Sequence, residues 1–306
     1  MMKIFLTGGT GMVGRNIIAL ATEQGHEVYA PSRSELNLAS IADIKAYLEE
    51  ITPDVVIHCA GLVGGIQANI AAPYDFCFEN LQMGTNIVHA SHLAGVSKLI
   101  NLGSSCMYPR FAENPLREEM VLQGELEPTN EGYAIAKVAT ARLADYVSQQ
   151  YGVEYKTYIP CNLYGYWDKF DPNKSHMIPA VIRKLDDAVK AGTEVVDIWG
   201  DGTARREFMF AEDLADFILF SLTKFEQVPR YINVGIGSDY SINEYYQAVA
   251  NVVGYTGRFE HDVSKPAGMK QKLVDINKQT QLGWSPKTSL EMGIEKTHAF
   301  YLNEVL

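Results

Sequence analysis

The sequence contains few cysteines and no CxxC pair. Its 306 residues include only Cys59, Cys77, Cys106 and Cys161, which lie far apart in the chain. This spacing argues against a disulfide framework, and no metal site is expected. A reducing cytoplasm is therefore the predicted compartment.

Long apolar runs are also missing. No stretch stays apolar over the roughly 20 residues that a membrane span requires. The first residues lack the basic region and cleavage site of a signal peptide. A membrane partner is therefore not expected.

Positive charge is in deficit, with 26 Lys and Arg against 37 Asp and Glu, a net charge of −11. This balance argues against a nucleic-acid partner. It does not exclude a basic cleft for an anionic ligand, because net charge does not describe a local surface. With 47% hydrophobic and 21% charged residues, the composition is typical of a globular protein with a full core.

A glycine-rich turn lies near the N-terminus, between a predicted strand at 3–7 and a predicted helix at about 14–24. The turn reads Gly8-Gly-Thr-Gly11-Met-Val-Gly14. Gly8 and Gly11 would let a pyrophosphate approach the backbone at the helix N-terminus, and Gly14 would let helix and strand pack closely. The predicted cofactor-binding residues of this turn are Gly8, Thr10, Gly11, Met12 and Val13.

The second predicted strand, 27–30, ends at Pro31-Ser-Arg33. A site for NAD usually has an acidic residue here for the ribose 2′-hydroxyl, whereas Arg33 suits a 2′-phosphate. NADPH is therefore the predicted cofactor, the alternative being that Arg33 is an ordinary surface arginine. The apolar run 54–61 predicts a buried parallel strand whose end, Ala60-Gly61, borders the cofactor.

Strands and helices alternate along the first half of the chain. This rhythm predicts an α/β fold, a Rossmann-type doubly wound parallel sheet, with a smaller mixed α/β C-terminal substrate domain. We expect an NADP-binding domain at 1–165, with returning segments near 205–238, and a mainly substrate-binding domain at 166–306. The further predicted helices are 75–95, 131–150, 178–191, 211–225, 241–253, 275–282 and 289–304, and the further strands 98–102, 153–160, 195–199, 231–235 and 258–263.

Tyr133 and Lys137 are four residues apart on the predicted helix 131–150, so they share one face. An ammonium beside a phenol lowers the tyrosine pKa from its usual value of about 10, which would let Tyr133 exchange a proton near neutral pH. An isolated pair of this kind would more simply pack on a helix surface. Ser104, after the predicted strand 98–102, and the glycine turn favour the catalytic interpretation. Together they resemble the extended short-chain dehydrogenase/reductase family.

Several longer motifs resemble the GDP-L-fucose synthase family more specifically. They are Gly103-Ser-Ser-Cys-Met-Tyr-Pro109, Leu126 to Lys137, Asn162-Leu-Tyr-Gly165, Ser175-His176, Trp199-Gly-Asp-Gly, Arg206-Glu-Phe208 and Lys265-Pro266. The resemblance implies NADPH-dependent conversion of GDP-4-keto-6-deoxy-mannose to GDP-L-fucose, by epimerisation at C3 and C5 and reduction at C4.

The resemblance also implies roles for five catalytic residues. Tyr133 would give a proton to the C4 oxygen, Lys137 would lower its pKa and contact the nicotinamide ribose, and Ser104 would hydrogen-bond the same oxygen. Cys106 and His176 would be the acid/base pair of epimerisation, with His176 also near the cofactor. The chemistry needs such groups, since inversion next to a carbonyl requires one group to remove a proton and another to return one. Taken alone, Cys106 could be a small buried residue and His176 a solvated loop residue.

The predicted substrate contacts come mostly from the second half of the chain. Arg206 would bind the diphosphate as a bidentate donor, the alternative being a surface salt bridge. Trp199 would border the guanine, and Lys184 or Lys265 would add positive charge. Ser105 and Asn162 complete the predicted substrate-binding set. By resemblance we also expect a homodimer formed through the helices around 80–95 and 131–150.

Departures from the family pattern keep alternatives open. Gly9 and Thr10 stand where an arginine is common, Tyr166 and Lys169 replace a usual Pro and Asn, and Ala267-Gly-Met269 replaces Asp-Gly-Thr. A C4 reductase of a related sugar, such as a GDP-6-deoxy-4-keto-heptose, with or without epimerisation, is therefore the first alternative. A non-catalytic NADPH-binding protein is a distant one. A 4,6-dehydratase would need an Asp-Glu pair after its Ser or Thr, and a 4-epimerase with bound NAD would need an acidic residue near Arg33.

Overall fold

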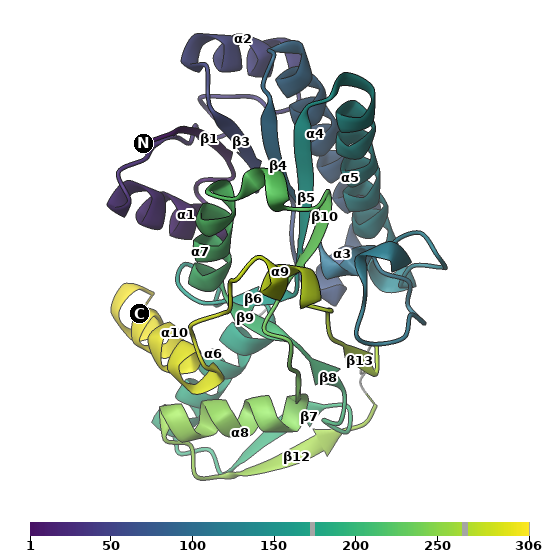
Figure 1. Cartoon of the computed structure of the whole chain (residues 1–306). Helices are drawn as coiled ribbons and strands as arrows, with labels where there is room; N and C mark the ends of the chain where they lie inside the picture. The colour runs from purple at the N-terminus through teal and green to yellow at the C-terminus, as the bar shows by residue number, and fades with distance from the viewer. Residues whose placement is uncertain (172–174, 265–268, 306) are drawn as a thin grey trace.

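A sheet of six parallel strands forms the centre of the larger part of the molecule (Figure 1). The computed structural model describes residues 1–171, 175–264 and 269–305. The strand order is β10-β5-β4-β3-β1-β2. The strands are β1 (Lys3–Thr7), β2 (Glu27–Tyr29), β3 (Val55–His58), β4 (Lys98–Leu102), β5 (Glu154–Pro160) and β10 (Tyr231–Val234). The predicted doubly wound parallel sheet is confirmed.

Helices cover both faces of this sheet. One face packs against α1 (Met12–Glu23) and α7 (Ala211–Leu222), and the other against α2 (Ile41–Ile51), α4 (Pro73–Leu93) and α5 (Glu131–Tyr151). Successive side chains of a strand point to opposite faces. Ile4 and Leu6 accordingly join the cluster beneath α1 and α7, whereas Phe5 joins the cluster beneath α2 and α4.

The chain returns to the large sheet after it has begun the smaller part. β9 (Phe208–Phe210) leads into α7, and β10 then pairs with β5 as the edge strand. The predicted return of a strand at 231–235 to the sheet is therefore confirmed. This return brings residues 205–210 close to the carboxyl ends of the sheet strands.

The smaller part has an aromatic core of its own, which includes Tyr164, Phe170 and Tyr245. Its helices are α6 (Met177–Ala191), α8 (Ile242–Val253) and α10 (Leu290–Glu304), whereas α9 (Asn277–Gln281) packs against β10 of the large sheet. Its strands form small sheets: β7 (Val195–Trp199) with β12 (Arg258–Asp262), β6 (Asn162–Tyr164) with β9, and β8 (Arg205–Arg206) between β11 (Tyr240–Ser241) and β13 (Gln271–Lys272).

The structure differs from the sequence-based expectations in short elements. No strand was predicted within 200–208, which contain β8 and the start of β9, since strands of two or three residues have no measurable periodicity. Helix α2, capped by the Ser40 side chain, and helix α3 (Ile66–Ala71) were not predicted. Lys265 and Pro266 lie outside the described residues. No helix within 1–171, 175–264 or 269–305 is long and apolar enough to cross a membrane.

Candidate active site

A cleft of about 1780 Å³ lies at the carboxyl ends of β1, β3, β4 and β5. Residues of the smaller part, including Trp199 and Arg206, complete its wall. Within the sheet, β2 pairs with β1 along one edge of that strand, and β3 pairs with β1 along the other edge. Parallel sheets bind ligands at such a switch point, outside the strand ends.

The glycine turn leaves no room for side chains where strand, turn and helix meet. Gly8 has φ +76°, and a Cβ there would lie 2.7 Å from the Ala60 nitrogen. A Cβ on Gly14 would lie 2.2 Å from the Gly8 oxygen. The predicted close packing at Gly14 is thus confirmed. Gly11 caps α1, and all five predicted residues of the turn line the cleft: Gly8, Thr10, Gly11, Met12 and Val13. This cradle fits a dinucleotide pyrophosphate.

The loop after β2 forms one end of the cleft. Arg33 is exposed and lines it together with Ser32. The Glu35 carboxylate accepts a hydrogen bond from the Ser32 backbone N–H at 2.7 Å, which folds the loop back on itself. Arg33 and the glycine turn thus line the same cleft.

The loop after β3 is fixed by a side chain of α4. Asn80 accepts from the Leu62 N–H at 2.9 Å and donates to the Leu62 carbonyl at 3.0 Å. A Cβ on Gly61 would come within 2.9 Å of the Asn80 oxygen. Gly61 therefore presents bare backbone to the cleft, which Ala60 also lines.

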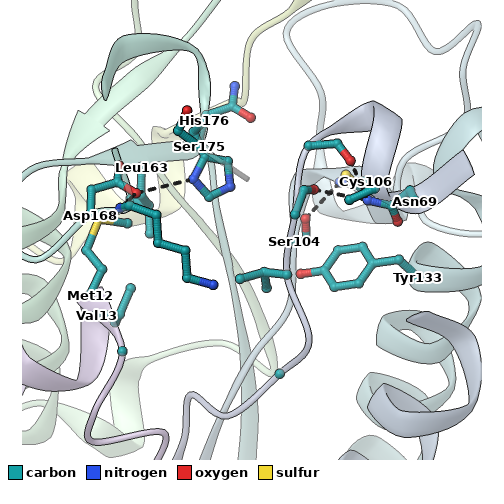
Figure 2. A pocket seen from close by; sticks show the side chains of 18 of the residues that line it. Met12, Val13, Asn69, Ser104, Cys106, Tyr133, Leu163, Asp168, Ser175 and His176 are labelled. Atoms are coloured by element: carbon teal, nitrogen blue, oxygen red, sulfur yellow. Dashed lines mark hydrogen bonds and ion pairs between the residues drawn. The ribbon is translucent and has the colours of Figure 1, made fainter. Parts of the chain in front are cut away.

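Ser104, Tyr133 and Lys137 meet at the end of β4. Ser104 begins the 3₁₀ turn Ser105–Met107, and its hydroxyl accepts from the Cys106 N–H at 3.2 Å. Lys137, on the second turn of α5, donates from its Nζ to the Leu102 carbonyl at 2.8 Å and lies 5.8 Å from the Tyr133 ring centroid. Figure 2 shows Ser104, Cys106 and Tyr133 on one side of the cleft.

The expectation that Lys137 lowers the tyrosine pKa is wrong for the protein without ligands. Burial raises the pKa of Tyr133, the nearby Cys106 raises it further, and hydrogen bonding with Ser104 only partly opposes this. Burial likewise lowers the pKa of Lys137 to about 8, against the opposing effect of Cys59 and Cys106. The low-dielectric site disfavours both charges. Tyr133 is therefore protonated at neutral pH, the form that a proton donor needs.

Cys106 is surrounded by hydrogen-bond donors. Its Sγ accepts from Asn130 Nδ2 at 3.1 Å and from Lys272 Nζ at 3.4 Å. Burial opposes the thiolate, but Lys272, Ser104 and Asn130 together outweigh it and hold the pKa of Cys106 below its usual value. The thiol can therefore act as a base more readily than an ordinary cysteine.

His176 lies across the cleft from Cys106, at the N-terminal end of α6 (Figure 2). Its Nδ1 is 3.6 Å from Oδ1 of Asp168, a buried carboxylate on the loop that follows β6. The His176 side chain is 37% exposed, so its ring remains accessible from the cleft. Two groups able to exchange protons thus face the same space from opposite walls.

The predicted substrate residues that the structure describes all line this cleft: Ser105, Asn162, Lys184, Trp199 and Arg206. Burial lowers the pKa of Arg206, whose Nη1 donates to the Arg205 carbonyl at 2.7 Å. Trp199 is half-exposed. The ammonium of Lys184 is held by Asp197, at 2.8 Å from its carboxylate and 2.6 Å from its carbonyl.

Sequence reasoning missed three residues of the site, Asn130, Asp168 and Lys272. Asn130 could have been found, because it lies three residues before Tyr133 in a matched motif. Lys272 had no local signal, since it belongs to a two-residue strand 166 residues from Cys106. Within the described ranges, no group of three or more His, Cys, Asp or Glu residues is placed to hold a metal ion.

Comparison with known proteins agrees with this geometry. The model of the NAD dependent epimerase/dehydratase family matches residues 4–235, from β1 to the end of β10. The chain belongs to this family. The match covers the glycine turn, the Ser104–Tyr133–Lys137 set and His176, and it ends before β13.

Relatives within the NAD dependent epimerase/dehydratase family act on GDP-sugars. The chain is 52% identical to the GDP-L-colitose synthase of Yersinia pseudotuberculosis over 304 residues, 99% of each chain. It is 49% identical to the GDP-L-fucose synthase of Azorhizobium caulinodans over 305 residues, 99% of this chain and 98% of the relative. The resemblance to GDP-L-fucose synthases is thus confirmed.

A solved structure of similar shape is a GDP-D-glycero-L-gluco-heptose synthase from Campylobacter jejuni, determined in the presence of NADPH. Its TM-score is 0.91 at 31% identity, covering 98% of each chain. The similarity extends beyond the Rossmann part and includes the smaller part that closes the cleft.

Proposed function

We propose that this protein is an NADPH-dependent epimerase/reductase that converts GDP-4-keto-6-deoxy-mannose to GDP-L-fucose. The observation that carries the proposal is the pairing of Cys106 and His176 on opposite walls of a cleft that also holds Ser104 and Tyr133. A simple reductase needs only the Ser–Tyr–Lys set. The relatives that act on GDP-sugars support the choice of substrate.

The cofactor would lie along the turn from Gly8 to Val13, with Arg33 at its 2′-phosphate and Ala60 and Gly61 beside it. When bound, NADPH supplies the hydride for C4. Residues 1–165 with the returning segments near 205–238 would form its domain, and 166–306 would mainly hold the GDP-sugar. Arg206 would bind the diphosphate, Trp199 would border the guanine, and Ser105 and Asn162 would contact the sugar. Because Asp197 already neutralises Lys184, we assign that lysine a smaller role.

In the mechanism, the hydroxyls of Ser104 and Tyr133 donate hydrogen bonds to the C4 carbonyl oxygen. This contact stabilises the enolate that forms when a proton leaves C3 or C5. One of the pair Cys106 and His176 takes that proton, and the other returns one from the opposite face. Tyr133, protonated because of its burial, then gives its proton to the C4 oxygen during reduction, and Lys137 positions the nicotinamide ribose.

A second substrate is favoured by the 52% identity to a GDP-L-colitose synthase. For this chain the substrate would then be the GDP-4-keto precursor of that sugar. Of the two replacements in the loop after β6, Lys169 lines the cleft, whereas Tyr166 packs against Phe210. The heptose synthase of similar shape supports a third possibility, a C4 reductase of a GDP-heptose.

The test is incubation with GDP-4-keto-6-deoxy-mannose in deuterated water, followed by NADPH and NMR of the product. Deuterium at C3 and C5 with the fucose configuration is the expected result. Oxidation of NADPH without deuterium would reduce the protein to a C4 reductase. In a parallel incubation with the GDP-4-keto precursor of colitose, turnover of that sugar alone would replace the first assignment with the colitose one. Binding of NADPH without turnover of any of these sugars would point to a non-catalytic protein.

We also propose a homodimer, formed by α4 and α5. These two helices pack together and leave large apolar side chains exposed: Tyr74, Phe78 and Leu93 on α4, and Ile135, Tyr146 and Tyr151 on α5. Exposed apolar side chains of this size on paired helices favour a protein interface. A cytoplasmic location would suit the four free cysteines. Light scattering of the purified protein tests the dimer, with a Tyr146→Glu, Tyr151→Glu double variant expected to be monomeric.

A further inference from the structure

Lys272 is a charged residue in contact with the candidate base Cys106. It lies beyond the match to the family model, which ends at residue 235. We propose that Lys272 is a positioning residue for epimerisation: its ammonium holds Cys106 as the thiolate, so that Cys106 removes the proton next to the carbonyl. The removal of a sugar proton by Cys106 rests on the proposed epimerase function. The effect of Lys272 on the ionisation of Cys106 exists in the free enzyme and can be tested without any sugar.

The contact between the two side chains determines which protonation state fits. An ammonium has three donors and no acceptor, so the sulfur that it faces at 3.4 Å must be the acceptor. The Asn130 amide nitrogen, at 3.1 Å, is a donor to the same sulfur. A thiolate satisfies both donors, whereas a neutral thiol is a weak acceptor and brings a proton of its own.

The position of Lys272 is built by the fold. β13 pairs in parallel with β8, which places Lys272 opposite Arg206. The next two residues are held from two sides: Leu273 N–H donates to Asn114 Oδ1 at 2.8 Å, and Val274 N–H donates to the buried Glu207 carboxylate at 2.9 Å. Asn114 belongs to the loop that follows β4, and Glu207 lies between β8 and β9. The ammonium therefore reaches the sulfur from a rigid support.

The other titratable groups that interact with Cys106 are Tyr133 and Lys137 of α5. Tyr133 is protonated and neutral there, so it does not compete with the thiolate. Lys137 adds positive charge, but it bonds to the Leu102 carbonyl. Lys272 is thus the cation in direct contact with the sulfur.

The proton transfers balance with Cys106 as the base. The C–H bond next to the carbonyl breaks, its electron pair moves to the C4 oxygen, and the proton forms an S–H bond on Cys106. His176, whose Nδ1 lies 3.6 Å from Asp168 Oδ1, acts as the acid and gives a proton to the opposite face, and the enolate returns to the ketone. One proton has passed from His176 to Cys106 through the sugar, and exchange with solvent restores both groups.

The experiment is the pH dependence of iodoacetamide alkylation of Cys106 in the free enzyme, followed by mass spectrometry of its peptide. Lys272→Met is expected to raise the midpoint by about 1–3 pH units, the usual effect of an opposite charge at this range. Lys272→Arg should keep a low midpoint. Lys270→Met is the matched control, because Lys270 is an exposed lysine two residues away, and it should behave as the wild type.

A second readout uses the sugar. Lys272→Met should slow deuterium incorporation next to the carbonyl by about 10-fold or more at neutral pH, with recovery at higher pH, since each unit of pKa changes the thiolate fraction tenfold. An unchanged alkylation midpoint in Lys272→Met would overturn the inference. If the same variant raised KM and left kcat unchanged, the ammonium would instead bind the diphosphate of the substrate. Should the methionine variant not fold, the same midpoint measured in Lys272→Gln decides. A shifted midpoint without turnover of any sugar would support the role of Lys272 and count against the proposed function alone.

Discussion

Replacing Gly14 by alanine tests whether the glycine turn is as tightly packed as its geometry indicates. A Cβ at this position would lie 2.2 Å from the Gly8 oxygen, 2.7 Å from Gly9 Cα and 2.8 Å from the Gly8 carbonyl carbon. All three are backbone atoms, so no side chain can rotate away. Ordinary contact begins at 3.4 Å, and the turn must therefore move by about 1.2 Å (3.4 − 2.2).

Two effects of this substitution have opposite signs. Alanine inside a helix is favoured over glycine by about 1 kcal/mol. Overpacking costs about 1–3 kcal/mol, and contact with three backbone atoms places this case at the upper end. We therefore expect a net loss of about 2 kcal/mol in the free energy of unfolding, and NADPH binding at least 10-fold weaker because the displaced turn no longer fits the pyrophosphate.

The assays are urea unfolding without cofactor and fluorescence titration with NADPH. Gly11→Ala is the matched control for stability, because its Cβ would meet only the Gly8 oxygen, at an ordinary 3.4 Å. It should lose only about 1 kcal/mol, the cost of alanine at an N-cap, although its Cβ enters the cleft and can weaken cofactor binding. A Gly14→Ala protein with wild-type stability and wild-type NADPH affinity would refute the reasoning.

Three further predictions concern the charges and protons of the site. Tyr133→Phe should lower kcat of the reduction by about 10²–10⁴-fold, while NADPH affinity stays unchanged. Stopped-flow oxidation of NADPH measures this rate. A decrease in kcat below tenfold would show that Tyr133 is not the proton donor. Arg33→Ala should weaken NADPH binding by about 10–100-fold, because a hydrogen bond to a charged group is lost, and it should leave NADH binding unchanged. Equal effects on the binding of both cofactors in a titration would contradict a contact between Arg33 and the 2′-phosphate. Lys137→Met should change how stability depends on pH. The folded pKa of Lys137 is lowered from 10.5 to about 8, so between these values the unfolded chain binds more protons and wild-type stability rises with pH. The free energy of unfolding of the wild type relative to Lys137→Met should therefore increase by about 3 kcal/mol from pH 8 to 10.5. Urea unfolding of both proteins at each pH measures this. If the difference in stability between them did not depend on pH, the ammonium would be well solvated.

Local patterns predicted the parts of the site that depend on neighbours in the chain. The glycine turn could be identified because strand, turn and helix follow one another within 20 residues. Tyr133 and Lys137 share a helix face because of their spacing alone. The ends of the long helices were predicted to within a few residues, whereas α2, α3 and the short strands β8 and β13 were missed, since periodicity needs longer segments than these strands provide.

The protonation of the site could not be predicted in the same way. The spacing of Tyr133 and Lys137 indicated a lowered tyrosine pKa, but burial raises it, because desolvation depends on everything that packs around the phenol. Lys184 is predicted as a substrate contact, and no local pattern indicated that its ammonium is bound to Asp197. Each of these outcomes depends on which groups the fold brings together.

The sequence by itself determined the fold class, the cofactor turn and the residues Ser104, Tyr133, Lys137, Cys106 and His176 as candidates. Only the tertiary structure decided their electrostatic environment. Lys272 contacts Cys106 across 166 residues of sequence, and Asp168 approaches His176 from a separate loop. The physical reason is that helices and turns form through contacts between near neighbours, whereas the charge state of a buried group is set by all the groups around it, whatever their place in the chain.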